Sequence, residues 1–91
     1  MNVPFFSEKA EAELVERIGT MSASGVCLGY DPVSMTACYV LVRVCDGQLP
    51  IMTRWNCEGP VDLPHARQMV EEIKAAVEAD EERIDLGHPI N

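Results

Sequence analysis

The dipeptide Asp46-Gly47, between two stretches rich in β-branched and aromatic residues, constrains the fold more than any other feature of the sequence. Asp-Gly is a preferred sequence for a tight hairpin turn, because glycine adopts positive φ at no steric cost. We therefore expect Thr36–Cys45 and Gln48–Cys57 to pair as an antiparallel hairpin. With a two-residue loop, Cys38 would face Trp55.

This register sorts the hairpin side chains onto two faces, because successive side chains of a strand point to opposite sides. We expect the almost wholly apolar face to be the core side, and it carries Cys38, Val40, Val42, Val44, Leu49, Ile51, Thr53, Trp55 and Cys57. The other face carries Tyr39, Leu41, Arg43, Cys45, Gln48, Pro50, Met52, Arg54 and Asn56.

Two helices and a further strand flank the hairpin in the sequence. Ser7 is a suitable N-cap for a helix that runs to about Met21, with an apolar stripe at Ala10, Leu14, Val15, Ile18 and Met21. Val26–Tyr30 alternates like a strand. A second helix is expected from about Leu63 to Ile84, with Asp62 as its N-cap, and its apolar stripe is Leu63, Ala66, Met69, Val70, Ile73, Ala76 and Val77.

These elements predict an α+β fold with the order α-β-β-β-α. We expect two layers, in which both helices cover the apolar face of a three-stranded antiparallel sheet. The 91 residues make one small domain, with residues 1–6 and 86–91 expected to be flexible. No internal repeat or low-complexity linker interrupts the chain.

The cysteines Cys27, Cys38, Cys45 and Cys57 leave several chemistries open. Two disulfides require an oxidising compartment, and a zinc site usually takes ligands in close pairs, which this chain lacks. The favoured interpretation is four reduced thiols that pack as small apolar side chains. A thiol–imidazole pair of Cys57 with His65 is the best catalytic alternative.

The charge balance excludes several classes of function. Seven Lys and Arg against 15 Asp and Glu give a formal net charge of −8, which disfavours direct binding of nucleic acid. No apolar run approaches the roughly 18 residues of a membrane span, and no phosphate-binding loop or hydrolase motif occurs. We expect a cytoplasmic protein without a signal peptide, not an enzyme, with no cofactor and no metal.

Two surfaces are candidates for binding a partner. The first is the acidic side of the second helix, with Glu71 and a ridge at i, i+3, i+4 and i+7 formed by Glu78, Glu81, Glu82 and Asp85. Clustered carboxylates repel one another, and a basic partner relieves that repulsion. The second is the outer sheet face, where Tyr39, Leu41 and Met52 would be exposed beside Arg43 and Arg54.

The element order is similar to that of the double-stranded-RNA-binding domain, but Asp62, His65 and Arg67 open the second helix and no lysine cluster is present. We therefore carry over no RNA-binding role. In size and charge the chain resembles the small acidic inhibitors that bacteriophages make against host defence, such as anti-CRISPR proteins. That resemblance implies an inhibitor that blocks a basic, nucleic-acid-binding surface of a partner protein.

Two alternatives to the inhibitor remain. One is a homo-oligomer that binds a small anionic ligand, such as a nucleotide, at a subunit junction lined by Tyr39, Arg43 and Arg54. A homodimer through the outer sheet face is as reasonable as a foreign partner, because two-fold dimers are the commonest oligomers. The other is a metal- or thiol-dependent protein that uses Cys57 and His65.

Overall fold

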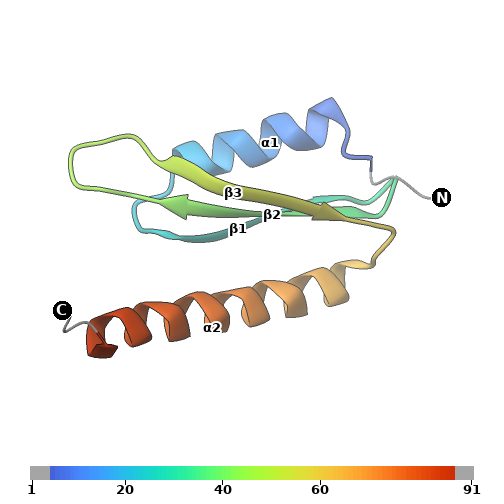
Figure 1. The fold of residues 1–91 in the computed structure, drawn as a ribbon. Helices are drawn as coiled ribbons and strands as arrows, with labels where there is room; N and C mark the ends of the chain where they lie inside the picture. The colour runs from blue at the N-terminus through green and yellow to red at the C-terminus, as the bar shows by residue number, and fades with distance from the viewer. Residues whose placement is uncertain (1–4, 88–91) are drawn as a thin grey trace.

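The computed structural model describes the backbone of residues 5–87 and the side chains of residues 5–79. Its elements follow the order α1 (Glu8–Gly19), β1 (Gly25–Asp31), β2 (Thr36–Arg43), β3 (Ile51–Glu58) and α2 (Leu63–Gly87), shown in Figure 1. The strands form one antiparallel sheet in the order β1-β2-β3. The predicted α+β class and the α-β-β-β-α order are confirmed.

The helices lie on opposite faces of the sheet, so the expectation that both cover one face is wrong. Figure 1 shows the sheet between α1 and α2, and the fold therefore has three layers. On one face Leu14 and Ile18 of α1 pack with Cys38, Val40 and Val42 of β2. On the other, Ala66 and Val70 of α2 pack with Ala37 and Tyr39.

The physical reason for two cores is that β1 and β2 carry apolar side chains on both faces. In the observed register Gly29 lies opposite Cys38 and Leu28 lies opposite Tyr39. Cys27 therefore joins the α1 core, and Val26, Leu28 and Tyr30 join the α2 core. A strand that is apolar on both sides must be covered on both sides.

The hairpin turn forms as predicted, but the strands do not pair right up to it. Gly47 has φ 75°, and the N–H of Gln48 donates to the carbonyl of Cys45 over 3.1 Å. Pairing begins only at Arg43 opposite Ile51, so the connection is a longer loop. The predicted pairing of Cys38 with Trp55 is consequently wrong by two residues.

In the observed register Cys38 lies opposite Cys57, and Val40 lies opposite Trp55. Leu41 pairs with Arg54 but Val42 pairs with Met52, so Thr53 is an extra residue in β3. Such a bulge changes the face on which the following side chains lie. It puts Met52 on the α1 side, with Val42, rather than on the face of Tyr39 and Leu41.

Cys38 and Cys57 form a disulfide between β2 and β3, with their Cα atoms 4.0 Å apart. The interpretation of four reduced thiols is therefore wrong for this pair. The error follows from the register. With the expected two-residue loop, Cys38 would face Trp55, and Cys57 would lie two residues further along the strand. Cys27 and Cys45 are free, and Cys45 is exposed.

The start of α1 is anchored to the sheet by a short network around Asp31. The Ser7 hydroxyl caps the helix by accepting from the N–H of Ala10. The Ser7 N–H in turn donates to Asp31 Oδ2 over 3.0 Å, and the N–H of Val33 donates to Oδ1 over 3.0 Å. Of the predicted flexible lead-in, Phe5 and Phe6 are described, and Phe6 packs against the α1 core.

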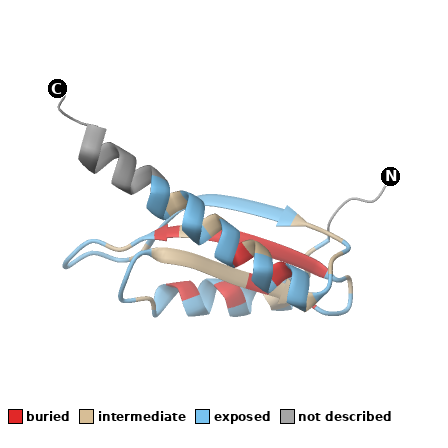
Figure 2. Ribbon diagram, turned by 90° about the horizontal axis from the view of Figure 1, so that it is seen from below, coloured by how far each residue is buried: buried red, intermediate tan, exposed pale blue. Residues whose placement is uncertain are grey.

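The strand β3 is the least covered part of the sheet. Both helices lie mainly over β1 and also pack against β2. Figure 2 shows β3 as an exposed strand along one margin of the fold. Its large side chains Ile51, Met52 and Trp55 are 50%, 47% and 37% exposed. The two edge strands of the sheet thus differ, because the helices cover the faces of β1 and leave those of β3 largely exposed.

Candidate interaction surfaces

α2 carries exposed carboxylates at Glu71, Glu72 and Glu78. Glu71 is paired with Lys74 over 3.5 Å, and Glu72 accepts a long contact from the Gln68 amide. Within the part of the chain whose side chains are described, Glu78 has no ion pair. The exposed surface of α2 is therefore acidic, although Glu78 also borders a hollow between the helix and the sheet.

The predicted ridge continues along the same helix. α2 runs without a break to Gly87, so Glu78, Glu81, Glu82 and Asp85 keep their spacing on one helical element. Residues three, four and seven apart share one side of an α-helix. The side chains of Glu81, Glu82 and Asp85 lie outside the described residues.

The predicted patch on the outer sheet face does not form as expected, because α2 covers Tyr39 and Met52 lies on the opposite face of the sheet. Tyr39 is 5% exposed and lies beneath α2, where the sequence pattern predicted an open face. Leu41 is half-buried, and Met52 is on the α1 side of the sheet. The placement of α2 and the bulge at Thr53 together account for both errors.

Four members of the predicted set do come together on the α2 side, with Leu41 beside the other three. Tyr39, Arg43 and Arg54 line a groove of about 760 Å³ between the sheet and α2. The helix supplies the opposite wall through Ile73, Ala76 and Val77, which the sequence analysis placed wholly in the core. A neighbouring hollow of about 290 Å³ adds Lys74 beside Arg43 and Glu78. Arg43, Arg54 and Lys74 thus bring positive charge together, although the chain as a whole has a formal net charge of −8.

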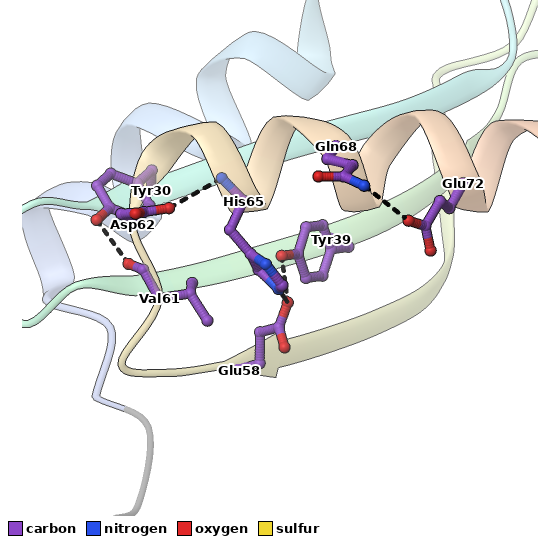
Figure 3. Close-up of polar contacts among 8 residues, drawn as sticks. All are labelled: Tyr30, Tyr39, Glu58, Val61, Asp62, His65, Gln68 and Glu72. Carbon is purple, nitrogen blue, oxygen red and sulfur yellow. Dashed lines mark hydrogen bonds and ion pairs between the residues drawn. The ribbon is translucent and has the colours of Figure 1, made fainter.

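At the other end of this groove, Tyr39, Glu58 and His65 form a polar cluster that the sequence analysis missed. The Tyr39 hydroxyl donates to Glu58 Oε2, and His65 Nε2 lies 3.8 Å from the same oxygen, as Figure 3 shows. Burial, the hydrogen bond to Glu58 and the charge of Glu58 raise the pKa of Tyr39 well above its ordinary value. Glu58 lies beside Tyr39 because of the register of β2 and β3, and the length of the hairpin loop determines that register.

The loop before α2 is held by two further hydrogen bonds in Figure 3. The Tyr30 hydroxyl donates to the carbonyl of Val61 over 2.7 Å, and Asp62 Oδ1 accepts from the N–H of His65 over 2.9 Å. Asp62 therefore caps α2 as the sequence predicted. These bonds fix the first turn of α2 against β1.

The proposed thiol–imidazole pair is not formed. Cys57 is bonded to Cys38, so it has no thiol to act as a nucleophile. The His65 ring faces Glu58 instead. Among the described residues no group of three His, Cys, Asp or Glu side chains is arranged to hold a metal ion, and none of the described helices combines the length and apolarity needed to cross a membrane.

No protein-family model, curated protein or solved structure matches this chain significantly. The surfaces above are consequently interpreted from their own chemistry.

Proposed function

We propose that this chain is a non-enzymatic binding protein that covers a basic surface of a partner protein with the acidic side of α2. The contact residues on this proposal are Glu71, Glu78, Glu81, Glu82 and Asp85. A partner surface that normally holds nucleic acid has the required charge. The protein would then act as an inhibitor of the kind that phages direct against host defence.

The observation that carries this proposal is the run of carboxylates on a helix whose other side is used for folding. Ala66 and Val70 attach α2 to the sheet, which leaves Glu72 and Glu78 exposed to solvent. Lys74 with Glu71 is the single ion pair of a lysine or arginine within the described side chains. Carboxylates without cationic partners in their own chain favour association with a basic surface.

A capture experiment with matched charge reversals tests the proposal. Tagged wild-type protein is incubated with bacterial lysate at low and high salt, and bound proteins are identified by mass spectrometry. One variant carries Glu78→Lys, Glu81→Lys and Glu82→Lys on α2. The control carries Glu11→Lys, Glu13→Lys and Glu16→Lys on α1, which changes the net charge by the same amount on the opposite face.

We expect a basic protein that wild type retains at low salt and releases at high salt, because exposed charge pairs are screened. The α2 variant should lose it and the α1 variant should keep it. Equal loss in both variants would mean that net charge alone attracts the protein, which would refute a specific α2 surface. An unaffected α2 variant would refute it as well.

A second candidate function rests on the groove lined by Tyr39, Arg43 and Arg54. Two guanidinium groups beside an aromatic ring suit a small anionic ligand such as a nucleotide. The groove lies within one chain, so this version does not need the subunit junction of the earlier hypothesis. Calorimetric titration with ATP should give binding that Arg43→Gln plus Arg54→Gln removes. No heat of binding with wild type would exclude a nucleotide.

A further inference from the structure

The outer edge of β3 presents backbone groups that no described residue satisfies. β3 pairs with β2 on one side, and the sheet ends there. The Cα atoms of Cys38 and Cys57 are 4.0 Å apart, the close spacing of a pair that exchanges no backbone hydrogen bonds. The N–H and C=O groups of Cys57, and by alternation those of Trp55, therefore point to the open edge. An edge of this kind is a template for another strand.

Arg54 and Glu58 add a charge pattern to this edge. They lie opposite Leu41 and Ala37, so both are on the α2 face of the sheet. They are four positions apart along the strand, a distance of about 13 Å, which is too far for a salt bridge within one chain. Arg54 has no ion pair or side-chain hydrogen bond among the described residues. Glu58 is held in place by Tyr39 and His65 and remains partly exposed.

We propose that β3 pairs antiparallel with β3 of a second copy of this chain, around a two-fold axis at Asn56. In this register Arg54 of each copy lies opposite Glu58 of the other, which gives two salt bridges on one face. Trp55 lies opposite Cys57 of the second copy, and these are the residues whose backbone groups point outward. This single register therefore pairs the backbone groups that point outward and also places opposite charges across from each other.

The neighbouring residues limit the pairing to Arg54–Glu58. The bulge at Thr53 interrupts the strand on one side, and Pro60 lacks an N–H on the other. On the α1 face, Trp55 is 37% exposed in the single chain. Across the two-fold axis the two Trp55 rings occupy diagonal positions, a spacing that large side chains can bridge. The dimer would extend the sheet to both copies and cover these rings.

Analytical ultracentrifugation tests the dimer, with wild type studied up to roughly 200 μM because a contact of this size gives a weak complex. Arg54→Glu places two acidic residues opposite each other, and Glu58→Arg places two arginines opposite each other. The control is Arg43→Glu. It reverses the same charge on the same face of the sheet, but on β2 and therefore away from the open edge. A non-reducing gel excludes dimers linked through Cys45.

We expect wild type and Arg43→Glu to dimerise, and each edge variant to raise the dimer Kd by about tenfold or more, since like charges replace two ion pairs. An equimolar mixture of Arg54→Glu and Glu58→Arg should recover the dimer, because every cross-strand pair is then of opposite charge. This rescue does not depend on any foreign partner, so its failure is distinct from failure of the proposed function.

Three results would overturn the proposal. Wild type could remain monomeric at the highest concentration. Arg54→Glu could dimerise as strongly as wild type, which would place the contact elsewhere. The mixture of the two edge variants could stay monomeric although each variant keeps the wild-type circular dichroism spectrum, which would refute the Arg54–Glu58 register.

Discussion

At the scale of single residues, Gly29 marks a close approach between α1 and the sheet. A Cβ built on Gly29 would lie 2.6 Å from Leu14 Cδ2 and 2.8 Å from Phe6 Cζ. Leu14 is fully buried, so it has little space into which it could withdraw. The close approach of α1 to β1 therefore requires glycine, although Val26–Tyr30 otherwise has an ordinary strand pattern.

We predict that Gly29→Ala lowers the free energy of unfolding by roughly 1–3 kcal/mol, the usual cost of an overpacked core. Urea denaturation followed by circular dichroism measures the change. Gly19→Ala is the control, because a Cβ there meets no atom within 4 Å. Equal stabilities of Gly29→Ala and wild type would show that α1 does not lie against β1 as described.

Asp31 is the residue through which the acid sensitivity of the fold can be tested. Its pKa is lowered from the ordinary value of 3.8, first by the hydrogen bond from the Ser7 N–H and also by that from Val33, against an opposing effect of burial. A carboxyl whose pKa is lower in the folded state stabilises the fold above the unfolded pKa. That contribution disappears as the pH falls through the folded pKa.

We therefore predict that Asp31→Asn is less stable than wild type at neutral pH, and that the difference shrinks as the pH falls below 3.8. Denaturation of both proteins between pH 7 and acid conditions gives this difference directly. A difference that stays constant, or grows, in acid would mean that ionised Asp31 does not hold the start of α1.

At the scale of elements, most of the secondary structure was predictable from local patterns. Capping by Ser7 and Asp62 and the apolar periodicity predicted both helices, and the three strands fall close to their expected ranges. Turn chemistry at Asp46-Gly47 predicted the turn itself. These signals are local, and each depends on the geometry of a few neighbouring residues.

The pairing of β2 with β3 was not predictable by the same means. The turn residues specify the turn, but a turn does not require the flanking residues to pair immediately. A shift of two residues keeps most side chains on their faces, so the apolar pattern alone does not reveal it. The shift nevertheless decides that Cys38 meets Cys57 and that Glu58 meets Tyr39.

The disulfide between β2 and β3 gives a prediction for this pair of elements. Cys38 and Cys57 are 19 residues apart, and closing a loop of this length restricts the unfolded chain by about 3 kcal/mol. Cys57→Ser should lose stability of this order, measured by urea denaturation without reductant. Cys45→Ser, at an exposed free cysteine, should change little. Equal effects of the two substitutions would argue against the Cys38–Cys57 bond.

At the scale of the whole molecule, the position of α2 determines which surfaces remain available. By covering Tyr39, α2 removes the predicted sheet patch and creates the groove beside Arg43 and Arg54. Because both helices lie mainly over β1, the edge of β3 stays open. The exposure of Glu71 and Glu78 on α2 agrees with the sequence pattern, since helical spacing is independent of the face that the helix covers.

The sequence pattern already contained a signal for two cores. Val26, Leu28 and Tyr30 alternate along β1, while Tyr39 and Leu41 alternate along β2 on the face assigned to solvent. The register of these two strands places both sets on one face. The hairpin pattern alone does not indicate the second core, because it contains no information about the side chains of β1.

The most direct test of the three-layer arrangement is a nuclear Overhauser spectrum of labelled methyl groups. We predict contacts from the Tyr39 ring to the methyl groups of Ala66 and Val70, and from the Leu14 methyl groups to Val40. If both helices covered one face, Val40 would contact methyl groups of α1 and α2 alike, and the Tyr39 ring would contact neither helix. That result would contradict the fold and, with it, the groove and the open β3 edge.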